Sequence, residues 1–274
     1  MYTDFQVKRE NYTLTGYKWA AETPKALVVL IHGMGEHAGR YAHVAMRLSD
    51  EGYTVYAPDL PGHGRSEGKR GHIGCSYEIV KIVDDVIIYA KKDCPDVPVF
   101  VMGHSMGGNI ALAYRYYRRD IEEITGYVSS SPWLMLADPK MEKRYKLGVF
   151  AAMILPKVTF KANIGDGTKS LCKNPAMAPP DSMCHGQISL QTAVDRERDA
   201  RLVMAKADEG KPVYLFNGSA DSICLPEGAH LFRDRAGRIC TYKEWDGLDH
   251  ETMNEDVWQD VVDGVIGWLD GMVK

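Results

Sequence analysis

A serine flanked by glycines stands between an apolar run and a helical pattern, in the motif Gly103-His104-Ser105-Met106-Gly107-Gly108. Such a turn between a strand and a helix presents the serine hydroxyl at the carboxyl edge of a sheet. Gly103 and Gly107 leave room for the two elements to approach each other, and the start of the helix favours developing negative charge. The pattern predicts that Ser105 is a nucleophile for acyl transfer, with an ordinary glycine turn as the alternative.

A serine hydroxyl is a weak nucleophile at neutral pH, so it needs a base and a group that orients the base. Asp221 follows the apolar run of residues 212–216, and His250 follows the run of residues 239–245. Both side chains are therefore expected on loops at the sheet edge that carries Ser105. The order serine, aspartate, histidine along the chain is the order that this kind of site uses. We predict His250 as the base and Asp221 as the acid that orients it.

Other residues compete for these two supporting roles. Asp195 lies in a long segment away from the strands, while Asp246 and Asp249 are too close to His250 in sequence to reach it from a separate strand. His230 falls in a helical stretch, where we expect it to pack or to be solvated.

A second turn follows an apolar run at Leu30-Ile31-His32-Gly33-Met34-Gly35. A tetrahedral oxyanion needs two backbone N–H donors, one from the residue after the nucleophile and one from a loop of this kind. We assign these donors to Met106 and Met34, whose side chains would then line an apolar acyl channel. Plain core packing of both methionines is the alternative.

The apolar runs around these motifs predict a mostly parallel sheet with helices on both faces. Runs without polar alternation are typical of strands covered on both sides, and helical periodicity separates them here. The expected strands are residues 26–31, 54–57, 97–102, 126–129, 212–216 and 239–245. The expected helices include residues 76–92, residues 106–119 and a C-terminal helix. Two N-terminal stretches, near residues 5–7 and 13–19, are expected to form an antiparallel edge hairpin.

The segment of residues 132–211 interrupts this alternation. It is too long to be a structureless loop in a compact domain, and residues 145–155 carry apolar side chains at helical spacing. We predict a core of residues 1–131 and 212–274 and an inserted lid of residues 132–211. The apolar face of the lid helix is expected either to meet lipid aggregates or to pack inside the lid.

Length, charge and cysteine content exclude several classes of protein. The 274 residues suffice for one α/β domain with an insertion, and the net charge of −4 gives no attraction to nucleic acid. The first residues lack the apolar stretch of a secretory signal, so a cytoplasmic location is expected. The six cysteines show no CxxC spacing and are expected as thiols. Cys172, Cys184 and His185 lack a fourth ligand, so no metal is expected.

Four motifs together resemble the monoglyceride lipase and lysophospholipase group of α/β-hydrolases. They are HGMGEHAGRY at 32–41, DLPGHGRSEG at 59–68, GHSMGG at 103–108 and GSADSIC at 218–224. The resemblance covers about residues 25–130 and 212–270. It implies an eight-stranded sheet, a lid over the active site and hydrolysis of esters with a lipid-like acyl chain, without a cofactor.

The resemblance also implies a polar pocket for the alcohol part of the substrate at Glu36, Arg40 and Tyr41. A surface salt bridge at a helix start is the alternative there. Residues 156–190 depart from the family pattern, which leaves the acyl chain and the alcohol open.

We expect a serine hydrolase of lipid-like esters, monoacylglycerols above all, that forms an acyl-enzyme on Ser105 and touches lipid aggregates or membranes through its lid. The alternatives are a short-chain carboxylesterase, a thioesterase or a serine aminopeptidase on the same triad. A non-catalytic binding protein would normally lack one member of the triad, and all three are present.

Overall fold

The computed structural model describes residues 1–10, 12–138, 140–162, 171–174, 176, 179 and 181–273. The strands are β1 Thr3–Lys8, β2 Thr13–Trp19, β3 Ala26–Ile31, β4 Tyr53–Pro58, β5 Val99–His104, β6 Ile124–Ser130, β7 Thr159–Lys161, β8 Gln187–Ser189, β9 Val213–Gly218 and β10 Cys240–Trp245. The helices are α1 Ala42–Asp50, α2 Ser76–Lys91, α3 Met106–Tyr117, α4 Met141–Ile154, α5 Leu190–Ala205, α6 Pro226–Ala236 and α7 Trp258–Met272. Short 3₁₀ turns cover Ala38–Tyr41, Gly237–Ile239 and Thr252–Asn254.

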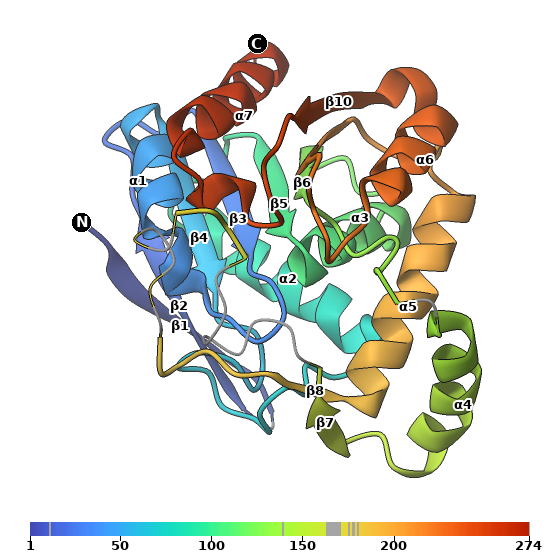
Figure 1. Cartoon of the computed structure of the whole chain (residues 1–274). Coiled ribbons are helices and arrows are strands. Elements are labelled where there is room, and N and C mark those ends of the chain that lie inside the picture. Colours follow the sequence, from blue (N-terminus) through green and yellow to red (C-terminus); the bar gives the residue numbers. More distant parts are fainter. Residues whose placement is uncertain are drawn as a thin grey trace.

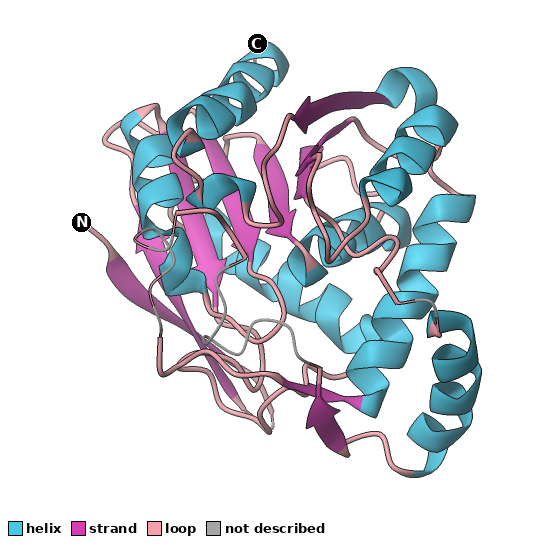
Figure 2. Ribbon diagram, viewed as in Figure 1, coloured by secondary structure: helices cyan, strands magenta, loops and turns pink. Residues whose placement is uncertain are grey.

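One large sheet forms the centre of the molecule, with strand order β1-β2-β4-β3-β5-β6-β9-β10 (Figures 1 and 2). The strands from β4 to β10 pair in parallel, while β1 with β2 and β2 with β4 pair antiparallel. The predicted mostly parallel, eight-stranded sheet and its N-terminal edge hairpin are therefore confirmed.

The end of β5 and the burial of β10 differ from the sequence-based expectation. β5 was predicted as residues 97–102 but runs to His104, fully buried, so that it ends directly before Ser105. β10 was predicted to be covered on both faces but alternates between half-buried and exposed residues. The reason is its position as the last strand of the sheet, where less of the protein covers it.

Helices cover both faces of the sheet, and each face has its own apolar core. On one face α1 and α7 pack through residues such as Val44, Leu48, Val261 and Val265. On the other face α2, α3 and α6 pack through residues such as Val83, Val86, Ile110 and Phe232. Burial of each such side chain stabilises the fold by roughly 1.5–3 kcal/mol, which fixes the strand ends that carry the site.

The segment of residues 132–211 contains α4, β7, β8 and α5, and several of its residues lie outside the described part of the chain. In Figure 1 α5 lies between α4 and the core, and it contacts both α3 and α4. Arg196 and Asp199 of α5 form a buried ion pair at 2.7 Å, and Ser76 donates to Asp199 at 2.6 Å. Within the described residues, each helix is too short or too polar to cross a membrane.

Candidate active site

Ser105 lies on the tight turn between β5 and α3, with φ 55° and ψ −115°. This left-handed backbone is uncommon and strained for a residue with a side chain. Three backbone hydrogen bonds hold it in place. The Ser105 N–H donates to Ser130 O at 2.9 Å, and the Ser105 carbonyl accepts from the N–H groups of Asn109 and Trp133, both at 3.0 Å.

The glycines on either side of Ser105 are required by close backbone approach. A Cβ atom on Gly103 would overlap the backbone carbonyl of Gly107, and one on Gly107 would overlap the carbonyl oxygen of Ile31. The approach of strand and helix that the motif predicted is therefore present in the structure. It leaves the Ser105 hydroxyl as the group presented at the turn.

Ser105, His250 and Asp221 form one hydrogen-bonded chain. His250 Nε2 lies 2.9 Å from Ser105 Oγ, and His250 Nδ1 lies 2.7 Å from Asp221 Oδ2. All three residues are buried. With the carboxylate accepting from Nδ1–H, the Nε2 atom is left to accept the proton of the serine hydroxyl.

The charge of Asp221 counters the effect of burial on His250. Burial alone lowers the pKa of His250, but the hydrogen bond and charge of Asp221 raise that pKa above its ordinary value of 6.5. The ring of His104 lies 4.8 Å from that of His250, and burial holds the pKa of His104 well below 6.5. His104 is thus a neutral neighbour that adds no competing positive charge.

The competing residues have other partners. His230, on α6, pairs with Glu244 of β10 at 2.6 Å, and Asp246 accepts from Ser219 at 3.3 Å. Asp195 lies on α5, where it pairs with Arg198 at 2.7 Å.

The loop after β3 supplies the second predicted oxyanion donor. The Gly33 N–H already donates to Glu36 Oε1 at 2.5 Å, which leaves Met34 as the next donor in the loop. Met106 is the first residue of α3, where backbone N–H groups have no acceptor within the helix. Their roles as oxyanion donors stay a prediction.

An apolar cavity of about 810 Å³ opens beside the oxyanion loop. Met34 of the oxyanion loop and Ser222, next to Asp221 in sequence, both line this cavity. Ser105 itself is not among the lining residues. Its walls include Leu136, Tyr145, Leu147, Ile188 and Val194. Met34, as expected, is among the residues that line this cavity, whereas Met106 is not, and its side chain is fully buried in the core.

Glu36, Arg40 and Tyr41 lie together but use their polar groups within the protein. The Tyr41 hydroxyl donates to Glu36 Oε1 at 2.6 Å, and Arg40 Nε lies 3.1 Å from Glu36 Oε2. Arg40 Nη2 also donates to Glu251 Oε2 at 2.8 Å. Sequence reasoning missed Glu251, although its place directly after His250 was a usable signal.

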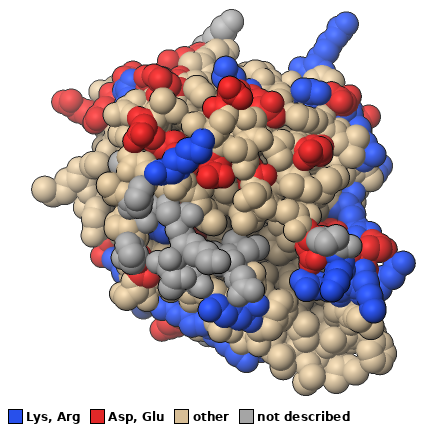
Figure 3. Space-filling model, viewed as in Figure 1, with Lys and Arg blue, Asp and Glu red and all other residues tan. Residues whose placement is uncertain are grey.

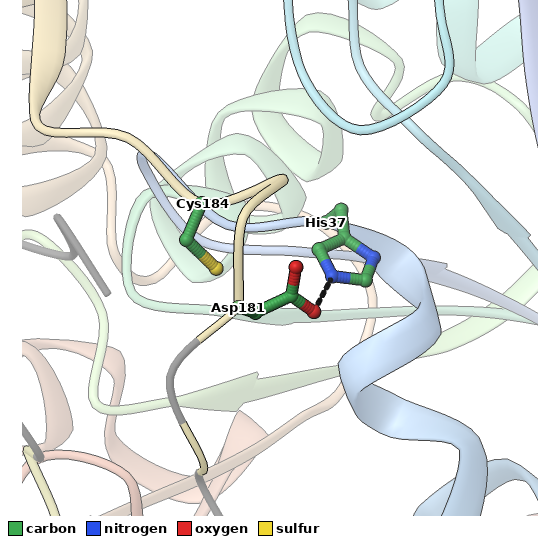
Figure 4. A group of neighbouring side chains, drawn as sticks. All are labelled: His37, Asp181 and Cys184. Atoms are coloured by element: carbon green, nitrogen blue, oxygen red, sulfur yellow. Dashed lines mark hydrogen bonds and ion pairs between the residues drawn. The ribbon is translucent and has the colours of Figure 1, made fainter. Parts of the chain in front are cut away.

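A cysteine, a histidine and an aspartate meet near this loop, in a different combination from the one considered above. Figure 4 shows the His37 ring facing Asp181, with the sulfur of Cys184 beside them. Their ligand atoms lie within 4.8 Å of one another, and His37 Nε2 is 2.7 Å from Asp181 Oδ2. Because the Arg40 guanidinium lies 3.7 Å from the Cys184 sulfur, its charge opposes a cation here. We assign no metal to the group, which instead joins residues 181–184 to the oxyanion loop.

The fold and the hydrogen-bonded serine define the class, an α/β-hydrolase of the serine type. The family described as "Serine aminopeptidase, S33" matches residues 22–257. The monoacylglycerol lipase of Mycolicibacterium smegmatis is 32% identical over 92% of this chain and 90% of its own length. The crystal structure of the Paleococcus ferrophilus monoacylglycerol lipase is 31% identical, with a TM-score of 0.82 over 93% of this chain and 98% of that one.

An abhydrolase domain-containing protein of Dictyostelium discoideum is 31% identical over 97% of this chain, which spans 28% of that relative's length. The chain belongs to the S33 family and, within it, to the monoacylglycerol lipase group of α/β-hydrolases. The resemblance and the predicted class, a serine hydrolase of carboxylic esters, are confirmed.

Proposed function

We propose that this protein hydrolyses monoacylglycerols and similar single-chain lipid esters, with Ser105, His250 and Asp221 as its catalytic triad. The observation that carries the proposal is the hydrogen-bonded chain from Ser105 Oγ through His250 to Asp221, on a strained turn beside an apolar cavity. Relatives named as monoacylglycerol lipases at more than 30% identity support the substrate.

The proposed mechanism has two half-reactions. His250 Nε2 takes the proton of Ser105 as its Oγ attacks the ester carbonyl, and the N–H groups of Met34 and Met106 stabilise the oxyanion. The carbonyl re-forms as the bond to the alcohol oxygen breaks, and His250 gives its proton to that oxygen. Water then attacks the acyl-enzyme with His250 again as base, which releases the fatty acid and restores Ser105. Asp221 keeps the imidazole in the required tautomer throughout.

The cavity suits an acyl chain rather than a polar substrate. Its walls are mostly aliphatic, and each methylene that moves from water into it contributes about 0.8 kcal/mol to binding. Affinity should therefore rise with chain length until the cavity is full. A short-chain carboxylesterase would show no such rise.

We further propose that residues 132–211 act as a lid and that α4 meets lipid surfaces. Three side chains on its C-terminal half are strongly exposed: Phe150 69%, Met153 79% and Ile154 64%. Figure 3 shows an uncharged surface at the lower right, over this half of α4, below a group of Lys and Arg side chains. Exposed apolar side chains that lie together on a surface are typical of sites that contact lipid or another protein. The inner side of the same helix lines the cavity through Tyr145, so a lipid could pass from surface to site.

Two experiments test the proposed activity. Ser105→Ala should abolish both turnover and labelling by a fluorophosphonate, whereas Ser49→Ala, on the exposed end of α1, should keep both. Measurement of kcat/KM on mono-, di- and triacylglycerols of one chain length should favour the monoacylglycerol. Thioesters and aminoacyl amides measured alongside test the other activities. Equal rates on all three glycerides, or preference for an amide, would overturn the substrate assignment.

The cytoplasmic location expected from the sequence stays a proposal. Fractionation of the cells that make the protein, with immunodetection in the soluble and membrane fractions, tests it. Recovery from the membrane fraction would instead support the contact of α4 with lipid.

A further inference from the structure

A buried network of ionic groups connects the oxyanion loop to the loop that carries His250. Glu36 accepts from the Gly33 N–H and the Tyr41 hydroxyl, and its second oxygen meets Arg40 Nε at 3.1 Å. Arg40 reaches across to Glu251, next to His250 in sequence, at 2.8 Å. The side chains of Glu36, Arg40 and Glu251 are only 8%, 14% and 10% exposed. Such buried groups are costly unless they are paired, and here each has a partner.

We propose that Glu36, Arg40 and Glu251 form a positioning relay, which fixes the oxyanion loop relative to His250 and places a second carboxylate behind the catalytic histidine. The inference rests on the proposed triad and adds Glu251 to its supporting residues. It also gives Glu36 and Arg40 a role other than binding the alcohol part of the substrate.

The mechanical part of the relay begins at Gly33. Glu36 Oε1 lies so close to Gly33 that a Cβ atom there would contact it at 2.6 Å, and the same Cβ would lie 3.3 Å from the Ser105 Cβ. Glu36 therefore packs against the peptide that leads directly to the Met34 N–H. Loss of its carboxylate would leave this peptide free to move. The Met34 N–H would then no longer be preorganised as an oxyanion donor, so it would stabilise the transition state less.

The electrostatic part of the relay acts on His250. The charged groups that act on its ring are Asp221 after β9, Glu251 on its own loop and Glu36 after β3. Arg40 pairs with Glu36 and Glu251, and the neutral His104 faces the ring from β5. After Asp221, the charges of Glu251 and Glu36 also raise the pKa of His250. A negative charge near the imidazolium stabilises the ion pair that forms when Ser105 attacks.

Glu251→Gln removes the negative charge of this side chain but keeps its shape, and the amide oxygen can still accept from Arg40. We expect the acid limb of the pH profile of kcat/KM to move to lower pH by about half a unit. Glu255→Gln is the matched control. Glu255 is a buried carboxylate on the same loop that accepts from the backbone of Asp249 and Lys173, and its variant should leave the acid limb in place.

Two variants of Glu36 test the mechanical part of the relay. Glu36→Ala should lower kcat by about 10²-fold with little change in KM, because the loss falls on the oxyanion donor. Glu36→Gln should recover part of that loss, since its amide oxygen can accept from Gly33 N–H. Circular dichroism and melting curves show that the variants compared are folded.

Separate outcomes distinguish this inference from the proposed function. Activity that survives Ser105→Ala would overturn the triad itself. An inactive Ser105→Ala together with an unmoved acid limb in Glu251→Gln would overturn the electrostatic part. A rise in KM at constant kcat in both Glu36 variants would overturn the mechanical part and favour the alcohol pocket.

Discussion

Asp221 uses both oxygens of its carboxylate, and this double use fixes the geometry of the proposed base. Oδ1 accepts the backbone N–H groups of Ile223 and Cys224, both at 2.9 Å, while Oδ2 accepts from His250. The two backbone bonds prevent rotation of the carboxylate. The imidazole is therefore oriented by a group that is itself held by the main chain.

Asp221→Asn should lower kcat by on the order of 10⁴, as the same change does in proteases with this constellation, because the amide stabilises the wrong histidine tautomer. KM should change little, and the melting temperature should stay near that of the unchanged protein. Steady-state kinetics on a monoacylglycerol gives the test. Asp246→Asn, at an exposed aspartate nearby, is the control and should keep normal rates. Near-normal turnover in Asp221→Asn would move the role elsewhere, with Asp249 as the next candidate.

The order of the motifs along the chain sufficed to predict that Ser105, Asp221 and His250 lie together. Each residue follows a strand, and the carboxyl ends of parallel strands lie at the same edge of the sheet. The contact between Arg40 and Glu251 was out of reach of such reasoning. These residues are 211 positions apart, and nothing in their local sequence shows that their side chains meet. The sequence therefore indicated Glu36 and Arg40 beside the oxyanion loop, as either a pocket or a salt bridge, but not Glu251 as their partner.

At the scale of elements, α4 stands out because it is apolar on more than one side. Only Ala152 of this helix is buried, while its C-terminal side chains point to solvent and its inner side lines the cavity. An ordinary surface helix has one apolar stripe that faces the core. The sequence-based expectation left open whether the apolar face packs inside the lid or is exposed, and the exposed fractions favour exposure.

Replacing both Phe150 and Ile154 by Ser should lower activity on emulsified monoacylglycerol several-fold and leave activity on a soluble short ester nearly unchanged. The reason is that these side chains contribute to binding a lipid surface but are mostly outside the cavity. Parallel assays on the two substrates give the measurement. Ile88→Ser, at a side chain 60% exposed on α2, controls for a general loss of surface hydrophobicity. An equal loss on both substrates would show that the helix supports the site only structurally.

The core elements were predictable from sequence, and those of the segment 132–211 largely were not. Buried strands such as β3 and β5 show themselves as unbroken apolar runs, because both of their faces are covered. The short β7 and β8, of three residues each, depend on pairing with each other and leave no such pattern. α5 buries Asp195, Arg196 and Asp199, so its periodicity is polar where a core helix would be apolar.

At the scale of the whole molecule, the site is built around histidines that the fold keeps neutral. His32 accepts from the Leu60 N–H at 2.9 Å and lies next to His63, with ring centroids 5.2 Å apart. Burial lowers the pKa of His32 to about 4 and holds the pKa values of His63 and His104 well below 6.5. His32 and His63 pack the oxyanion loop against the glycine-rich turn after β4, and His104 lies at the end of β5 beside His250.

The fold should therefore lose stability as the pH falls from 6.5 to about 4. In this range the unfolded chain binds protons at these histidines and the native protein does not, so the free energy of unfolding decreases with falling pH. For His32 alone the shift from 6.5 to about 4 corresponds to about 3 kcal/mol. His250 acts in the opposite direction, since its raised pKa gives stability that is present below 6.5 and lost as the pH rises through its folded value.

Urea unfolding curves at half-unit steps between pH 4 and pH 8 measure this dependence. His63→Asn tests its source, because the amide can still donate to Pro61 O, which His63 Nδ1 contacts at 3.0 Å, but it cannot titrate. We expect the variant to show a smaller slope of unfolding free energy against pH below 6.5, whatever its stability at pH 8. A slope as steep as that of the unchanged protein would mean that the titration of His63 does not contribute to the loss of stability in acid.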